Sequence, residues 1–405
     1  MSDRKTFFVT SPIFYPNAQP HMGHAYTTLL CDVLTRYHRT VLNQETYFLT
    51  GTDEHAEKIV KAAQAQGQEP GAYLETIVER FKDLYEKLDI RYDQFIRTSD
   101  QEVHWPGAIE MWNRLHNAGK LEKREYVGLY CVGCEAFKTE KELVDGLCPD
   151  HGIAPEKVSE QNWFFKLKEF GPQLEKLIES GELAIVPESR KKEILSFIRS
   201  GLEDVSFSRP KQKMTWGIPV PNDPEQTMYI WVDALTNYLS ALGFGRGEDL
   251  MRFWPGTHVI GKDILRFHTV FWPAMLLSAG LALPEGIFVH GIIISDGRKM
   301  SKSLGNIISP YEMINRYGTD ASRYLLLRHV HPTEDTDVTW EKLDEWYTAN
   351  LTNGLGNLVA RIMKLAETYL SPDVNKDWER NFISASKRHE GSFEDDLREF
   401  KFNSA

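Results

Sequence analysis

The sequence is poor in cysteine, with 4 cysteines among 405 residues. So few cysteines cannot form the disulfide framework that stabilises small secreted domains, and we therefore expect a cytoplasmic protein. Long hydrophobic runs are also missing. The longest, Thr269–Leu283, is interrupted by Pro273 and Ser278 and is shorter than the roughly 20 residues that a membrane-spanning helix needs. Prolines break the first 16 residues where a signal peptide would need an apolar stretch. We therefore expect no membrane partner.

The sequence also has fewer positively charged than negatively charged residues. The 47 Lys and Arg residues face 58 Asp and Glu residues, which gives a net charge of −11. A protein that binds DNA without sequence preference needs a positive surface, so DNA is not an expected partner. The 41% of hydrophobic and 26% of charged residues are typical of a globular protein, and the length allows two or three domains.

The first part of the chain alternates β-rich runs with helical patterns. Thr6–Thr10 is followed by a proline-containing loop, a helical pattern over His21–Arg39 and a second apolar run at Thr46–Thr50. This alternation predicts an α/β fold with a doubly wound parallel sheet. The pattern changes to short β-like pieces over Leu121–Pro221 and resumes at Met228. We therefore predict a sheet domain that is interrupted by an insertion of about a hundred residues.

Two histidines flank a glycine where the first helical pattern begins, in His21-Met22-Gly23-His24. Between a strand and a helix, free backbone N–H groups and the helix dipole favour a phosphate. Both imidazoles can face such an anion, and Gly23 allows a flat base to approach the backbone. Taken alone, the pattern would also fit two loop histidines beside a turn glycine.

A basic loop lies far downstream. The residues Lys299-Met300-Ser301-Lys302-Ser303 follow the turn sequence Ser295–Arg298, which comes after an expected strand at Ile287–Ile294. Two lysines and two serines suit a polyphosphate whose charge shifts during a reaction. A solvated basic turn would explain this segment alone, but both motifs in this order on an α/β pattern favour a nucleotide site.

The two motifs resemble the H-I-G-H and K-M-S-K-S signatures of class I aminoacyl-tRNA synthetases, with Met22 in place of isoleucine. That family activates an amino acid with Mg²⁺ and ATP, releases pyrophosphate, and passes the aminoacyl group to the terminal adenosine of tRNA. By this resemblance, His21 and His24 contact the ATP phosphates, and Lys299 and Lys302 stabilise the charge on the leaving pyrophosphate. The implied ATP site is completed by Gly23, Gly261, Asp263 and Ser301.

Four further segments are similar to methionyl-tRNA synthetases, with matching order and spacing from about Thr6 to Leu370: Ser11–Pro16, Gly51–His55, Tyr229–Leu235 and Gly261–Ile264. The resemblance implies a Rossmann-like catalytic domain whose substrates are ATP, L-methionine and tRNA(Met). A thioether is polarisable and attracts aromatic edges, which suits an aromatic pocket. The implied methionine-binding residues are Ile13, Tyr15 and Asp53 near the amino group, Arg209 near the carboxylate, and Trp231, Ala234, Tyr238, Ile264 and His268 around the side chain.

The predicted insertion contains a metal-type spacing. Cys131 and Cys134 are separated by two residues, and after thirteen more residues the same spacing recurs in Cys148 and His151. Two such pairs on turns can present four ligands tetrahedrally, as a structural zinc ion requires. We therefore predict one Zn²⁺ per chain with no catalytic role, a pattern that resembles the single-knuckle type of the family. Cys31 is expected in the core.

The resemblance also implies boundaries and a C-terminal helical part. From Trp346, apolar positions to Tyr369 trace one long helix that ends before Pro372, and Phe393, Leu397 and Phe400 suggest a second. Two helices bury less apolar surface than a bundle shares, so we expect most of the anticodon reader to be missing. The predicted parts are a catalytic first half at 1–117, a connective insertion with a zinc knuckle at 118–225, a catalytic second half with the lysine loop at 226–325, a linking segment at 326–345, and a partial anticodon-binding domain at 346–405.

Two other classes of protein share some of these features. A nucleotidylyltransferase has the H-x-G-H turn and a related lysine loop, but it needs neither the methionine register nor an insertion that faces tRNA. A non-catalytic tRNA-binding relative would have no need of the intact lysine loop and Asp53. Methionine-dependent exchange of pyrophosphate into ATP separates these possibilities from an aminoacyl-tRNA synthetase.

Overall fold

The computed structural model describes residues 6–132, 134, 136–138, 140–247, 249–300, 306–369 and 390–404. The chain forms two compact units. The first comprises Met1–Gln19, Thr35–Phe81 and Tyr92–Val289, and the second comprises Pro20–Leu34, Lys82–Arg91 and His290–Ala405. Within the described residues, no helix has both the length and the apolar character that crossing a membrane demands.

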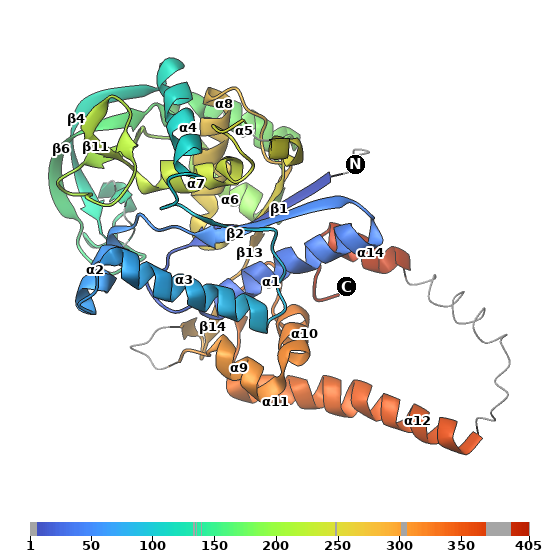
Figure 1. The fold of residues 1–405 in the computed structure, drawn as a ribbon. Helices are drawn as coiled ribbons and strands as arrows, with labels where there is room; N and C mark the ends of the chain where they lie inside the picture. Colours follow the sequence, from blue (N-terminus) through green and yellow to red (C-terminus); the bar gives the residue numbers. More distant parts are fainter. Residues whose placement is uncertain are drawn as a thin grey trace. The chain divides into compact units, whose positions relative to one another are not determined.

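The first unit is built on a six-stranded sheet with the order β3-β2-β1-β12-β13-β7. Figure 1 labels β1, β2 and β13 of this sheet. The central strand β1 pairs in parallel with β2 on one side and with β12 on the other. The strand order therefore reverses beside β1, and in such sheets the loops at the carboxyl ends near the reversal form the ligand site. This confirms the predicted doubly wound parallel sheet. The strands are β1 (Thr6–Phe14), β2 (Glu45–Thr52), β3 (Gln94–Arg97), β7 (Ile185–Val186), β12 (Thr257–Gly261) and β13 (Gly286–His290).

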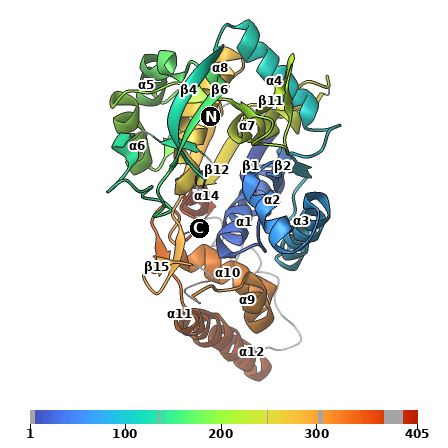
Figure 2. The same ribbon diagram turned by 90° about the vertical axis from the view of Figure 1, so that its left-hand side faces the viewer.

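Two antiparallel sheets account for the change of sequence pattern after residue 120. One has the order β5-β4-β6-β8 and the other the order β10-β11-β9. The long strands β4 and β6 lie side by side in Figure 2 and pair from Leu121↔Phe165 to Tyr130↔Glu156. The strands are β4 (Leu121–Cys131), β5 (Ala136–Lys138), β6 (Glu156–Phe165), β8 (Val205–Ser206), β9 (Ser208–Pro210), β10 (Pro219–Val220) and β11 (Asp223–Met228).

Helix α7 (Ile230–Ser240) is buried along its whole length in the first unit. It packs closely on α4 (Trp105–Asn117), because Gly107 has no side chain: a Cβ atom there would lie 2.5 Å from the Cβ of Ser240. The contact lets two helices from distant parts of the sequence support each other. The other helices that lie wholly or largely in this unit are α2 (Glu57–Ala65), α3 (Pro70–Lys87), α5 (Gly171–Ser180), α6 (Glu188–Arg199) and α8 (Trp272–Ser278).

The second unit is helical with one small sheet. A buried ion pair joins its parts: Arg323 donates to Asp32 at 2.7 Å and to the carbonyl oxygen of Leu88 at 2.8 Å. Asp32 also accepts from the backbone N–H of Arg91. The elements are α1 (Met22–Arg36), α9 (Pro310–Tyr317), α10 (Thr319–His329), α11 (Trp340–Trp346), α12 (Asn357–Tyr369), α14 (Glu390–Arg398), and the strands β14 (Ile293–Ser295), β15 (Arg298–Lys299) and β16 (Thr336–Asp337).

The predicted long C-terminal helix is present in the second unit. Its N-cap is Thr339, whose side chain accepts from the N–H of Lys342, and α11, a π-helical segment over Tyr347–Gly356 and α12 follow without a break. Side chains on α12 such as Leu358 and Ile362 are more than half exposed. Pro372, which was expected to end this helix, lies outside the described residues.

Two expected elements differ from the structure. The single strand expected at Ile287–Ile294 is divided into β13 and β14, which belong to different sheets. Gly291 lies at the break, where a Cβ atom would be only 2.2 Å from the carbonyl oxygen of Glu334, so the chain turns to meet that backbone. The final amphipathic helix ends at Arg398, because Phe400 adopts a left-handed conformation with φ of 58° and leaves the helix.

Candidate active site and metal cluster

Three predicted methionine-binding residues meet at the carboxyl ends of β1 and β2. Ile13 is in register with Gly51, and the N–H of Asp53 donates to the carbonyl oxygen of Phe14 at 2.9 Å, one residue before Tyr15. Gly51 is required at this place, since a Cβ atom would lie 2.0 Å from the carbonyl oxygen of Ile96 on β3. The carboxylate of Asp53 is thereby fixed in a buried position at the end of the sheet.

The predicted side-chain pocket residues gather between α7 and the turns after β12. Trp231, Ala234 and Tyr238 share one face of α7 by their spacing. The indole of Trp231 stacks on Phe267, with centroids 3.6 Å apart and planes at 7°. The hydroxyl of Tyr238 lies 2.7 Å from Nε2 of His268. Trp231 and Tyr238 on α7 thus each contact an aromatic ring of the segment after β12, Ala234 lies between them on the same face of the helix, and Ile264 contacts His268 through its carbonyl oxygen.

The tautomer of His268 follows from its two partners. Its Nδ1 lies 3.0 Å from the carbonyl oxygen of Ile264, which can only accept, so Nδ1 carries the proton and Nε2 accepts from Tyr238. Burial lowers the pKa of His268 to about 4, although the Ile264 carbonyl and Asp263 act in the opposite direction. The ring is therefore neutral at pH 7, and it offers a polarisable apolar face of the kind that a thioether prefers.

This burial predicts a pH-dependent stability. The folded protein keeps His268 neutral down to about pH 4, whereas the unfolded chain takes up a proton below about 6.5, so acid favours unfolding. We expect His268 to remove about 2 kcal/mol of stability between pH 7 and pH 5. Urea unfolding of the wild-type chain and of His268→Gln at both values measures this difference. An equal loss in both proteins would contradict the assignment.

The predicted ATP residues Gly261 and Asp263 follow directly on this cluster. Gly261 is the last residue of β12, and Asp263 lies in the 3₁₀ turn Lys262–Ile264, with its side chain exposed. Both are therefore at the carboxyl end of the strand that borders the reversal of strand order beside β1. This is the edge at which doubly wound folds bind nucleotides.

Arg209 has a different environment from the other predicted residues. Its guanidinium is paired with Glu160 at 3.0 Å and lies over the ring of Tyr130, 3.9 Å from the ring centroid. Lys213 contacts the same carboxylate at 2.8 Å. These contacts place Arg209 in the antiparallel part of the first unit, and none of these three partners belongs to the predicted methionine set.

The histidine motif opens helix α1 in the second unit. The N–H of Gly23 donates to Nδ1 of His21 at 3.1 Å, and the N–H of His21 donates to Nδ1 of His24 at 3.2 Å. The two rings stack with centroids 3.7 Å apart. Burial and the neighbouring His21 hold the pKa of His24 well below its usual value. A neutral ring whose Nδ1 accepts must carry its proton on Nε2, so each histidine presents an N–H donor at a helix N-terminus.

The lysine motif begins on a tight hairpin of the second unit. Strands β14 and β15 are joined by Asp296 and Gly297, both with positive φ, and the N–H of Gly297 donates to Asp337. Lys299 is the last residue of β15, whereas Ser301 and Lys302 lie outside the described residues. His290, just before this hairpin, has its Nε2 2.8 Å from the hydroxyl of Thr27 on α1. The helix that carries one motif is thus tied to the strand that leads to the other.

A buried network was missed by the sequence reasoning. Asp233 on α7 lies 2.5 Å from Nδ1 of His55 and 2.6 Å from Nε2 of His104, and Nδ1 of His104 lies 2.8 Å from the hydroxyl of Ser240. Although burial opposes ionisation, the two imidazoles lower the pKa of Asp233 to about 2. The signal in the sequence was a lone carboxylate among the apolar residues of a buried helix.

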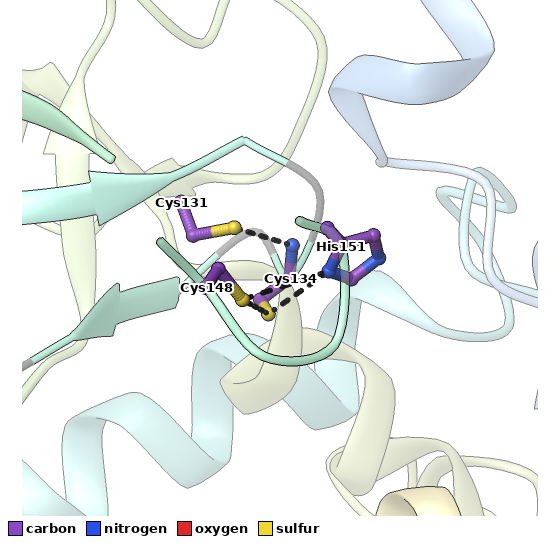
Figure 3. A group of neighbouring side chains, drawn as sticks. All are labelled: Cys131, Cys134, Cys148 and His151. Carbon is purple, nitrogen blue, oxygen red and sulfur yellow. Dashed lines mark hydrogen bonds between the residues drawn. The ribbon is translucent and has the colours of Figure 1, made fainter. Parts of the chain in front are cut away.

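The four predicted zinc ligands converge in the first unit, as Figure 3 shows. Their ligand atoms all lie within 4.8 Å of one another. The sulfur of Cys134 is 3.4 Å from that of Cys148 and 3.3 Å from Nδ1 of His151. Sulfurs bound to one tetrahedral zinc ion at about 2.3 Å would be about 3.8 Å apart, so the separations fit a shared metal and are too long for a disulfide. The cluster could hold a metal ion, as predicted.

The doubly wound sheet with residues at its switch point, the histidine motif at the start of a helix, and the lysine hairpin together define a class I aminoacyl-tRNA synthetase. The family model described as tRNA synthetases class I (M) matches residues 7–157 and 151–363. The chain belongs to this family.

Known proteins agree with that assignment. The chain is 42% identical to the methionine–tRNA ligase of Caldanaerobacter subterraneus subsp. tengcongensis over 99% of its own length, and 42% identical to the chloroplastic/mitochondrial enzyme of Arabidopsis thaliana over 90%. It spans only 64% and 60% of those two relatives. A structure of the Mycobacterium tuberculosis methionyl-tRNA synthetase in complex with methionyl-adenylate matches 98% of this chain and 81% of that one, with a TM-score of 0.89 and 38% identity. The free form of that enzyme matches with a TM-score of 0.82 and 34% identity.

Proposed function

We propose that this chain is a methionine–tRNA ligase. It would activate L-methionine with ATP to methionyl-adenylate and pyrophosphate and then transfer methionine to the 3′-terminal adenosine of tRNA(Met). The observation that carries the proposal is the 38% identity, over 98% of the chain, to a synthetase solved with methionyl-adenylate bound. The aromatic cluster around Trp231 and Tyr238 supports methionine as the amino acid, since sulfur interacts favourably with aromatic edges.

Each predicted residue would have a separate role in the first step. Asp53, near Ile13 and Tyr15, would accept from the methionine ammonium group, while Trp231, Ala234, Tyr238, Ile264 and His268 would enclose the thioether. Arg209, which is paired with Glu160, would contact the substrate carboxylate. The ATP phosphates would bind at the start of α1, where Nε2–H donors and backbone N–H groups favour an anion. The remaining proposed ATP contacts are Gly23, Gly261, Asp263, Lys299, Ser301 and Lys302.

The residues that accelerate the reaction are those that stabilise the charge formed in the transition state. Methionine's carboxylate attacks the α-phosphorus, and negative charge accumulates on the departing pyrophosphate. The Nε2–H groups of His21 and His24 and the ammonium groups of Lys299 and Lys302 would stabilise that charge, which appears only in the transition state. Mg²⁺ would accompany ATP and neutralise part of the phosphate charge, and the four-ligand cluster of Cys131, Cys134, Cys148 and His151 would hold one structural Zn²⁺. Reduced thiols at such a site accord with a cytoplasmic location.

The division of the chain into domains at residues 117, 225, 325 and 345 stays a prediction. So does binding of tRNA(Met), which would use surfaces outside the methionine cluster. A nucleotidylyltransferase is the alternative that shares the histidine and lysine motifs. It has no use for the aromatic cluster, which favours the synthetase.

The proposal is tested by exchange of labelled pyrophosphate into ATP. We expect exchange to depend on L-methionine and to fall at least a hundredfold when leucine replaces it. The reason is that the aromatic and polar side chains of the pocket would distinguish the unbranched thioether of methionine from the branched side chain of leucine. Labelled ATP formed without any amino acid would instead identify a nucleotidylyltransferase. No exchange with any of the twenty amino acids would contradict the proposed function.

A further inference from the structure

The carboxylate of Asp233 connects the two groups of predicted methionine-binding residues, one near Asp53 and one on α7, that are distant in sequence. It is the single charged residue of α7, with a side chain 1% exposed, and both of its oxygens are occupied by imidazole nitrogens. One imidazole belongs to His55, two residues after Asp53. Asp233 itself lies two residues after Trp231 and one before Ala234. The two groups of predicted methionine residues are therefore joined through the hydrogen bond between His55 and Asp233.

The loop between β2 and α2 is also held by several other elements of the first unit. At its start, the N–H of Asp53 donates to Phe14, and at Glu54 the side chain accepts from Arg97 at 2.8 Å. The indole N–H of Trp216 donates to the carbonyl oxygen of Glu54. These contacts hold the loop to β1, β3 and the antiparallel part. The contact between Nδ1 of His55 and the carboxylate of Asp233, at 2.5 Å, joins the loop to α7.

We propose that Asp233 is a positioning residue for methionine: through His55 it holds the Asp53 loop at a fixed distance from the face of α7 that carries Trp231, Ala234 and Tyr238. The inference rests on the proposed function. Methionine must be bound at its ammonium group and at its thioether at the same time. The distance between the Asp53 loop and the residues on α7 therefore sets the affinity for methionine. A link that is buried and charge-assisted keeps that separation constant.

The chemistry of the carboxylate also fixes the tautomers of both rings. An ionised Asp233 only accepts, so His55 carries a proton on Nδ1 and His104 carries one on Nε2. The amide of an asparagine has the same shape but offers one acceptor and one donor. The N–H group of the asparagine amide would therefore point at an N–H group of His55 or His104, unless that ring moved its proton to the other nitrogen. Asp233→Asn thus weakens the link between α7 and the rings without creating a cavity.

Equilibrium dialysis of labelled methionine, combined with the KM for ATP in pyrophosphate exchange, tests the proposal. We expect Asp233→Asn to raise the Kd for methionine at least tenfold and to leave the KM for ATP within twofold. His55→Gln, which removes the hydrogen bond between His55 and Asp233, should also raise the Kd for methionine at least tenfold and leave the KM for ATP within twofold. His104→Gln, which leaves that link intact, should raise the Kd less than threefold.

Asp32→Asn is a matched control, since Asp32 is equally buried and ion-paired but lies in the second unit. Its Kd for methionine should stay within twofold of the wild-type value. A parallel rise of the methionine Kd and the ATP KM in Asp233→Asn would indicate a general structural defect and overturn the inference, as would an unchanged methionine Kd. Should Asp233→Asn fail to fold, His55→Gln carries the same test. A wild-type chain that binds no methionine would refute the proposed function itself.

Discussion

Replacing His24 by alanine is expected to slow methionyl-adenylate formation at least a hundredfold while methionine binds nearly as before. The ring is neutral and presents an Nε2–H donor at the N-terminus of α1, where, by the proposed function, negative charge would develop on the departing pyrophosphate. A hundredfold loss corresponds to about 3 kcal/mol, which is the usual effect of removing one such donor. Lys302→Ala is expected to have an effect of the same size, by the same electrostatic argument.

Single-turnover kinetics measure this result, because they separate the rate of the chemical step from the affinity for methionine. His331→Ala and Lys364→Ala serve as controls: both side chains are exposed, and both lie in the same unit as the two motifs. We expect them to retain the wild-type rate. Loss of methionine affinity with an unchanged chemical rate in His24→Ala would show that the ring binds substrate and does not act on the reacting phosphates.

Removal of the metal is expected to have the second large effect. Freshly purified protein, prepared without chelators, should contain about one zinc ion per chain. Cys148→Ser should reduce this content to nearly zero, because three ligands cannot close a structural site. Asp145 and Gly146, both with positive φ, form a turn between Cys131 and His151, and we expect this segment to become sensitive to proteases when the metal is lost.

Elemental analysis and limited proteolysis test both parts of this prediction. Cys31→Ala is the matched control, since Cys31 is a buried cysteine on α1 that does not belong to the cluster. The Cys31→Ala protein should keep its full zinc content, and its segment between residues 131 and 151 should stay resistant to proteases. Absence of zinc from the wild-type protein, or full zinc content in Cys148→Ser, would contradict the assignment.

Patterns of short range could be predicted from the sequence. The alternation of apolar runs and helical periodicity predicts the parallel sheet, and the spacing of two cysteine pairs predicts the metal cluster. Asp296 and Gly297 likewise predict the turn before the lysine motif, since both residues tolerate a left-handed backbone. In each case, residues that are near in sequence determine the local geometry.

Contacts between distant segments could not be predicted in this way. The expected strand at Ile287–Ile294 divides because the backbone at Glu334 approaches Gly291, 43 residues earlier. Arg209 stays a predicted contact of the substrate carboxylate, and in the fold it is paired with Glu160 on β6, which the pairing of β6 with β8 brings near it. A charged residue takes the partner that the fold places beside it, and sequence spacing says little about that choice.

The sequence by itself predicted the class of fold, the histidine and lysine motifs, the four residues of the possible metal cluster and the aromatic residues around Trp231 and Tyr238. Only the tertiary structure decided how those aromatics contact one another, which nitrogen of His268 carries its proton, and that Asp233 joins His55 to His104 across 178 and 129 residues of chain. The physical reason is that periodicity and motif spacing act along the chain. Protonation, ion pairing and ring stacking depend instead on which side chains the packed core brings within about 4 Å.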